Sequence, residues 1–241
     1  MKISVIVPAY NEEKLLGESL RSIKAASTAW AGRGWQSELI VCDNNSTDAT
    51  TTVAQAEGAR VIFEPRNQIS RARNRGAEAA TGDWLLFVDA DSRPSPELFA
   101  DLAAEIEGGA SLGGGCTVRL DGNHFVANVV AGGWNRLSRL KRWAAGSFVF
   151  CETAAFRQLG GFSLELFASE EIEFSERLKR LARQQGKRVV ILHRHPLVTS
   201  ARKVHLYSIW EHLRFLGKTC LCLGRTLKTR EACPTWYDGR R

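Results

Sequence analysis

The first half of the chain alternates short apolar runs with segments of helical periodicity. The apolar runs lie at residues 3–7, 38–42, 60–63 and 84–88, and helical patterns follow at residues 12–23, 47–57 and 69–80 and from residue 96 onward. Apolar strands that alternate with helices are typical of a parallel sheet whose two faces are both covered. The chain is therefore expected to adopt an α/β fold, with a mainly parallel sheet flanked by helices.

Local sequence signals mark where helices begin. Asn11 is expected to cap the first helix, with Glu12 and Glu13 in its first turn. Ser95-Pro96-Glu97 has the order of cap, proline and acid that opens a helix.

The second half of the chain is less regular. Its strand patterns lie at 111–120, with a break at the glycines 113–115, and at 147–151 and 188–192, and its helix patterns at 125–143 and 171–184.

Two acidic residues end the fourth apolar run. Asp89 and Asp91 lie two positions apart directly after residues 84–88, so their side chains are expected to project together from the end of a strand. Open α/β sheets bind ligands at that edge. Two neighbouring carboxylates repel each other, and a divalent cation such as Mg²⁺ or Mn²⁺ relieves the repulsion. A solvated turn is the competing interpretation, because Asp-Ala-Asp-Ser-Arg-Pro is also good turn chemistry.

Loops after the other apolar runs belong to the same edge of the predicted sheet. The backbone from Pro8 through Ala9 to Tyr10 is placed to meet a nucleotide base, and the Tyr10 ring can stack on it. Asp43 can accept a hydrogen bond from a ring N–H of uracil or guanine, although a turn or helix cap explains it equally well locally. Glu12 has the alternative role of a partner for the helix dipole.

Composition and charge narrow the class of protein. The 241 residues carry a formal net charge of +7, which suits anionic partners such as nucleotides, nucleic acids or acidic lipid surfaces. No export signal, no apolar stretch of about 20 residues and no zinc-type cysteine spacing is seen. We therefore expect a cytoplasmic protein with reduced thiols.

Four blocks of residues, in the same order, resemble the family 2 glycosyltransferases. They are Val5–Glu13, Asp43–Asp48, the series Ala72-Arg73-Asn74-x-Gly76 with Gly82-Asp83-Trp84 and Asp89-Ala90-Asp91, and Gly160-Gly161-Phe162 followed by Glu170-Glu171. The resemblance covers about residues 3–200. It implies a GT-A fold over residues 1–203, with a nucleotide-binding half at 1–92 and an acceptor-binding half at 93–203.

The resemblance also implies roles for residues at the nucleotide and metal sites. Asp91 would hold a metal ion that bridges the two phosphates of a nucleoside diphosphate, and Asp89 would contact the ribose or metal-bound water. His195 is the first candidate for a third metal ligand, with His193 and His205 as alternatives. The residues expected to bind the nucleotide are Pro8, Ala9, Tyr10, Asn11, Glu12, Asp43, Arg71, Arg73, Asp89 and Arg202.

The acceptor hydroxyl needs a base, and the family usually has Glu-Asp where this chain has Glu170-Glu171. Glu171 stands at the position of the catalytic base and is one methylene longer than the usual aspartate. Glu170 is the second candidate. The alternative is that both acids favour the start of a helix.

These features favour a metal-dependent, inverting glycosyltransferase of hexosyltransferase type. It would use Mn²⁺ or Mg²⁺ and a nucleoside-diphosphate sugar, and its hydroxyl acceptor would be lipid-linked, a polysaccharide or another molecule. A sugar-phosphate nucleotidyltransferase is an alternative, although the loop after the first strand is not glycine-rich. A non-catalytic nucleotide-binding or nucleic-acid-binding protein is another, but no nucleic-acid motif is present and no nucleic acid is expected as a partner.

The C-terminal segment 204–241 has a character of its own. Apolar residues recur at three- and four-residue spacing from Leu206 to Leu227, which predicts a long amphipathic helix. Residues 202–241 hold nine Lys and Arg against three Asp and Glu. The helix is expected to lie on a membrane surface, on the domain core or against a second chain. Membrane contact would make the protein peripheral on the inner face of the membrane.

Overall fold

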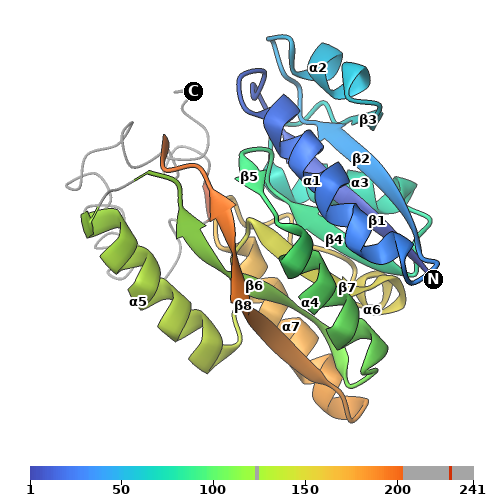
Figure 1. The fold of residues 1–241 in the computed structure, drawn as a ribbon, viewed down its shortest axis with the longest axis vertical. Coiled ribbons are helices and arrows are strands. Elements are labelled where there is room, and N and C mark those ends of the chain that lie inside the picture. The colour runs from blue at the N-terminus through green and yellow to red at the C-terminus, as the bar shows by residue number, and fades with distance from the viewer. Residues whose placement is uncertain (123–124, 203–227, 230–241) are drawn as a thin grey trace.

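The computed structural model describes residues 1–122, 125–202 and 228–229 (Figure 1). The strands are β1 (Lys2–Ala9), β2 (Gln36–Asp43), β3 (Arg60–Phe63), β4 (Trp84–Val88), β5 (Ser92–Arg93), β6 (Ser111–Leu120), β7 (Phe148–Glu152) and β8 (Arg188–Thr199). The helices are α1 (Leu16–Ala31), α2 (Thr50–Ala56), α3 (Ile69–Ala79), α4 (Pro96–Glu107), α5 (Phe125–Lys141), α6 (Thr153–Gln158) and α7 (Glu170–Gln184). The expected helix at 204–227 and the tail that follows it lie outside the described residues.

The described strands form one mixed sheet in the order β3-β2-β1-β4-β7-β6-β8-β5. The first four strands in this order are all parallel, which confirms the predicted parallel half of the sheet. The direction then reverses, because β7 is antiparallel to both β4 and β6, and β5 is antiparallel to β8. The parallel half thus ends at β4, the strand that leads into Asp89 and Asp91.

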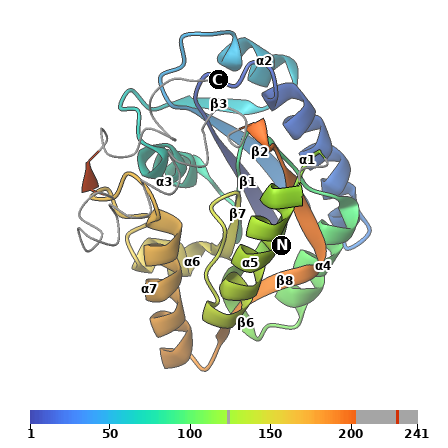
Figure 2. The ribbon, with the colours of Figure 1, turned by 90° about the vertical axis from the view of Figure 1, so that its left-hand side faces the viewer.

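Burial on both faces explains why the strands are apolar without interruption. In β4, Trp84, Leu86 and Val88 belong to one hydrophobic cluster, and Leu85 and Phe87 belong to the other. Helices α1 and α4 cover the first face, where Trp30 and Phe99 stack with their ring centroids 4.5 Å apart. Helices α3, α6 and α7 cover the second face (Figures 1 and 2).

Several element boundaries differ from the sequence-based expectation. Helix α1 begins at Leu16, so Asn11 does not cap it; Asn11 instead has a positive φ of 52° in the loop after β1. The cap at Ser95 is confirmed, because its side chain accepts a hydrogen bond from the Leu98 N–H. Strand β8 continues to Thr199, well beyond the predicted end at Leu192. Among the described helices, none is long and apolar enough to cross a membrane.

The glycines of β6 do not break the strand, contrary to the sequence-based expectation. β6 runs unbroken from Ser111 to Leu120, with irregular register against β8 on both sides of the glycines. A Cβ atom on Gly114 would collide with the backbone carbonyl of Val190. The glycines therefore allow β6 to approach the backbones of its neighbours where a side chain would not fit.

We predict that Gly114→Ala destabilises the protein by about 2–4 kcal/mol, because the strand backbone has to move to relieve the collision. The shift in the urea-unfolding midpoint measures this loss. Gly132→Ala is the control, since a Cβ there has nothing within 4 Å in the described structure. In a helix, that change should be neutral or stabilise by about 0.5–1 kcal/mol. Equal stability of the two variants would contradict the close approach of β6 to β8.

Candidate active site

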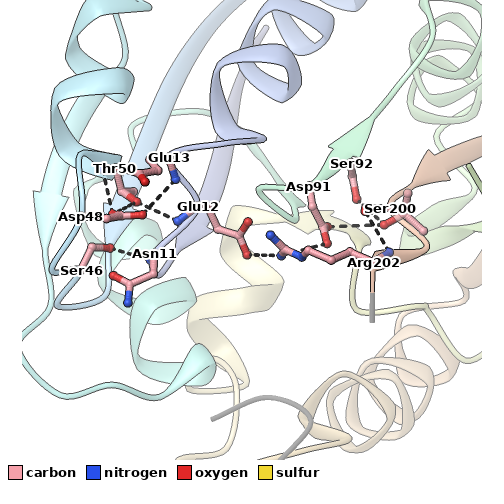
Figure 3. Close-up of polar contacts among 11 residues, drawn as sticks. Asn11, Glu12, Glu13, Ser46, Asp48, Thr50, Asp91, Ser92, Ser200 and Arg202 are labelled. Carbon is pink, nitrogen blue, oxygen red and sulfur yellow. Dashed lines mark hydrogen bonds and ion pairs between the residues drawn. The ribbon is translucent and has the colours of Figure 1, made fainter. Parts of the chain in front are cut away.

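The loops after β1 and β2 hold each other in place at the carboxyl end of the parallel strands (Figure 3). The Asn11 side chain accepts a hydrogen bond from the Thr47 N–H at 2.8 Å, and the Asn11 N–H donates to the Ser46 hydroxyl at 3.0 Å. The Glu12 N–H donates to the Thr50 hydroxyl at 2.8 Å. Asn11 therefore links the two loops at the edge of the site. These contacts explain why its backbone is left-handed and lies outside helix α1.

A cavity of about 530 Å³ opens beside these loops. Tyr10 and Arg71, both predicted to bind the nucleotide, line it together with Phe167. Phe167 comes from the acceptor-side segment before α7 and was not predicted, because no local pattern indicates that it faces the loop after β1. The remaining lining residues are Asn45, Pro65, Arg66, Asn67, Gln68 and Leu164. The size and the aromatic and basic lining suit a nucleoside.

Asp43 lies at the end of β2 and is 5% exposed. One of its carboxylate oxygens accepts a hydrogen bond from the Ser46 N–H at 3.0 Å, and the other accepts from the Thr51 hydroxyl at 2.9 Å. These contacts match the turn interpretation. An ionised carboxylate can accept about four hydrogen bonds, and these two leave Asp43 able to accept more. A contact from Asp43 to a base therefore stays a prediction. Pro8 and Ala9 pair with Cys42 and Asp43 within the sheet.

Arg202 bridges acids from the loops that follow β1 and β4 (Figure 3). Its Nη2 lies 2.7 Å from Glu12 Oε1 and 3.9 Å from Asp91 Oδ2. Glu12 is 6% exposed. Because α1 begins at Leu16, Glu12 does not lie in the first turn of that helix. Asp91 is also held by the Thr199 hydroxyl and by the Ser200 N–H, which donates to the Asp91 carbonyl. The end of β8 and the segment after it thus adjoin the predicted metal ligand.

Arg73 is the second arginine of the site, and it is buried with 1% exposure. Its Nη1 lies 2.6 Å from Glu170 Oε1, and its Nη2 lies 3.1 Å from Asp89 Oδ1 and 2.7 Å from the Gly146 carbonyl oxygen. Both terminal nitrogens of Arg73 are therefore engaged inside the protein, where they position Asp89 and Glu170. The expected contact of Arg73 with the nucleotide stays a prediction.

Glu170 and Glu171 open helix α7, as expected. Glu170 is 3% exposed, and burial raises its pKa although Arg73 acts in the opposite direction. Burial and the neighbouring Glu170 raise the pKa of Glu171 to about 8. A Cβ on Gly146 would lie 3.4 Å from Glu171 Cδ and 3.2 Å from Arg73 Nη2. The Glu171 carboxyl therefore lies beside the groups that hold Asp89.

His195 is not brought to the acidic pair. Its Nδ1 lies 3.0 Å from Asp101 Oδ2 on α4, and four extended residues, or about 13 Å of strand, separate it from Thr199 beside Asp91. Within residues 1–122 and 125–202, no group of three or more His, Cys, Asp or Glu side chains is placed to hold a metal ion. His195 instead contacts Asp101 on α4. The structure therefore does not support the expectation that His195 is a third metal ligand.

Comparison with known proteins gives the family. The model described as Glycosyl transferase family 2 matches residues 4–158, which is more than half of the chain. The chain belongs to glycosyltransferase family 2. An uncharacterized glycosyltransferase of Mycobacterium tuberculosis is 37% identical over 110 residues, which cover 46% of each protein. The undecaprenyl-phosphate 4-deoxy-4-formamido-L-arabinose transferase of Klebsiella pneumoniae is 35% identical over 130 residues, covering 49% of this chain and 37% of the relative.

A solved mannosyltransferase structure shares the fold. A mannosyltransferase from Pyrobaculum calidifontis, solved in complex with GDP-Man and Mn²⁺, superposes with a TM-score of 0.66 at 19% identity, over 98% of this chain and 73% of that one. The family 2 chain therefore has the GT-A α/β fold expected from its motifs. It spans about half the length of the curated relatives it matches.

We predict that Arg73→Gln destabilises the protein by about 3–5 kcal/mol, because the change leaves two carboxylates at least partly buried without their cation. Equilibrium urea unfolding measures the loss. Arg75→Gln on the same helix is the matched control, since Arg75 is 53% exposed and pairs with Glu78 on the surface; it should cost about 0.5 kcal/mol or less. A loss of the same size in both variants would contradict the role given to Arg73.

Proposed function

We propose that the chain is a metal-dependent, inverting glycosyltransferase that moves a hexosyl group from a nucleoside-diphosphate sugar to an acceptor hydroxyl. The observation that carries this proposal is the position of Glu171. Its carboxyl lies beside Gly146, next to the arginine that holds Asp89. A proton acceptor thus adjoins the acids at the end of β4, as transfer to a hydroxyl requires.

The residues present fit a divalent cation. Asp91 supplies carboxylate oxygens at the end of the parallel sheet, and Mg²⁺ and Mn²⁺ take such oxygens together with substrate phosphates and water. Asp91 is the residue proposed to hold the ion, with Asp89 beside it. When bound, the cation would offset the negative charge that develops on the departing diphosphate. The mannosyltransferase solved with GDP-Man and Mn²⁺ supports this assignment.

The proposed donor site extends from the cavity beside Tyr10 to Asp91. Tyr10 would stack on the base, Asp43 would accept a hydrogen bond from it, and Arg71 would lie against the nucleoside. Arg202 is placed between Glu12 and Asp91, and its guanidinium would donate hydrogen bonds to the diphosphate. Glu12 would keep the Arg202 side chain oriented towards the crevice.

Transfer is proposed to be a single displacement. The acceptor oxygen forms a bond to the anomeric carbon while the bond from that carbon to the β-phosphate oxygen breaks, and the nucleoside diphosphate leaves. The hydroxyl proton passes to the Glu171 carboxylate. Attack from the side opposite the leaving group inverts the anomeric configuration.

The acceptor hydroxyl is proposed to belong to a lipid-linked molecule or a polysaccharide. The Klebsiella pneumoniae relative is named as a transferase acting on undecaprenyl phosphate, which supports a lipid-linked acceptor. Such an acceptor fits the expected cytoplasmic location with contact to the inner face of the membrane.

Thermal shift with UDP, GDP and dTDP, each with and without Mn²⁺, tests the donor site. We expect one nucleotide together with Mn²⁺ to stabilise the protein by about 2–3 kcal/mol at a hundredfold excess over its Kd, and either component alone to do much less. Asp91→Asn should abolish the joint effect, while Asp101→Asn on α4 should retain it. A joint effect that survives in Asp91→Asn would contradict the metal assignment.

Glu171→Gln should lower kcat for sugar transfer by about 10²–10⁴ without weakening nucleotide binding, because the amide cannot take the proton. A carboxyl with a raised pKa is protonated at low pH and becomes a base as the pH rises. For the unaltered protein, kcat/KM should therefore rise with pH and level off above about 8. Glu173→Gln on the same helix is the control, since Glu173 pairs with Arg177. Full activity in Glu171→Gln would remove Glu171 from the mechanism.

A further inference from the structure

Helix α5 packs on the sheet through one side only. The Asn135 side chain accepts a hydrogen bond from the Val118 N–H at 2.9 Å and donates one to the Val118 carbonyl at 2.8 Å. Ser138, one turn further along, is fully buried. These residues fix which side of α5 faces β6 and β8. Figure 1 shows the helix at the left-hand edge of the molecule.

The opposite side of α5 is apolar and exposed. Val129, Val130, Leu137 and Leu140 have exposed fractions of 58%, 66%, 39% and 80%. At about 100° per residue, these four side chains fall within a sector of about 100° centred opposite Asn135 and Ser138. Gly133 lies in the same sector, and a Cβ there would have nothing within 4 Å in the described structure. A helix that faces water normally shows the reverse pattern, with its polar side outward.

Basic residues border this apolar stripe. By the same spacing, Arg136 and Lys141 lie at its two edges. Arg139 lies nearer to Asn135, and Arg142 follows the end of the helix. All four are exposed, and none of them forms an ion pair within residues 1–122 and 125–202. The sequence has no acidic residue between Asp121 and Glu152. Two grooves that flank the helix hold further basic residues together with three acids. Arg93 pairs there with Asp121 and Arg188 with Glu105. The other basic lining residues are Arg119, Arg136, Arg139, Arg142, Arg194 and His193, and the third acid is Asp101.

Charge decides which partner fits this surface. A second copy of the chain would place one basic α5 against another, and the C-terminal segment 202–241 carries six net positive charges of its own. Both would bring like charges together. An anionic lipid surface fits both the apolar stripe and the basic residues of α5, because its acyl region accommodates apolar side chains and its headgroups attract Arg and Lys.

We propose that the outer face of α5 docks the protein on an anionic membrane, with Val130, Leu137 and Leu140 entering the headgroup layer and Arg136 and Lys141 contacting lipid phosphates. This docking surface differs from the one considered in the sequence analysis, where membrane contact was an expectation for the C-terminal segment 204–241. The proposal does not depend on sugar transfer, because vesicle binding is measured without substrate.

Co-sedimentation of the full chain with vesicles tests the proposal. We expect binding to vesicles of phosphatidylcholine mixed with phosphatidylglycerol, and little binding to phosphatidylcholine alone. Leu137→Ser with Leu140→Ser should weaken binding about tenfold, since two buried apolar side chains are lost. Arg136→Gln with Lys141→Gln should weaken it about tenfold as well and reduce its salt dependence. Gly133→Leu should strengthen it severalfold.

Matched controls separate α5 from the rest of the surface. Phe63→Ser changes an apolar side chain that is 54% exposed on β3, and Arg75→Gln removes a charge that is 53% exposed on α3. Both should bind vesicles like the unaltered protein. Circular dichroism melting should show that all the variants remain folded, because the substituted side chains are exposed.

Three results would overturn the proposal. Unchanged vesicle binding in both α5 double variants would assign any attachment to another part of the chain. A dimer in size-exclusion chromatography that dissociates in Leu137→Ser with Leu140→Ser would show that a second copy covers this face. Binding of polyuridylic acid that displaces vesicles, together with no effect of the leucine substitutions, would identify the surface as one for nucleic acid.

Discussion

The buried guanidinium of Arg73 is the interaction on which the rest of the site depends. It joins α3 to Asp89 at the end of β4, to Glu170 at the start of α7 and to the Gly146 carbonyl oxygen before β7. Removing a charge from water costs several kcal/mol, and two carboxylates with good hydrogen-bond geometry offset much of that cost. One side chain thereby joins segments from both parts of the chain at the place where the proposed base stands.

The parallel half of the fold could be predicted because strands that are buried on both faces have a recognisable sequence pattern. Each strand needs apolar residues at successive positions, and the resulting runs at 3–7, 38–42, 60–63 and 84–88 are visible without a structure. The orientation of Asp89 and Asp91 could not be predicted in the same way. The strand ends at Val88 and the chain turns, with the Ser92 N–H donating to the Asp89 carbonyl. Two-residue alternation therefore no longer applies, and the two acids pair with different arginines.

Contacts between distant segments account for the other differences. Asn11 has the local chemistry of a helix cap, yet its side chain binds the backbone of the loop after β2, 36 residues away. Phe167 and Gly146 reach the site only because the fold brings acceptor-side loops to it, and no spacing in the sequence reports this. His195 lies on β8, whose extension beyond Leu192 was not predicted, and its partner Asp101 belongs to another helix.

The continuous hydrogen-bonded sheet limits which parts of this glycosyltransferase can change without loss of the fold. Backbone hydrogen bonds run from β3 to β5 without a gap, and glycines at 113–115 bring β6 so close to its neighbours that larger residues are excluded. The two halves are therefore joined as one rigid plate, and neither can swing against the other without breaking main-chain pairing. The loops around residues 142–147 and 159–169 adjoin the site without belonging to the sheet. Under the proposed function, a designer changing acceptor choice would therefore graft those loops and leave the strands untouched.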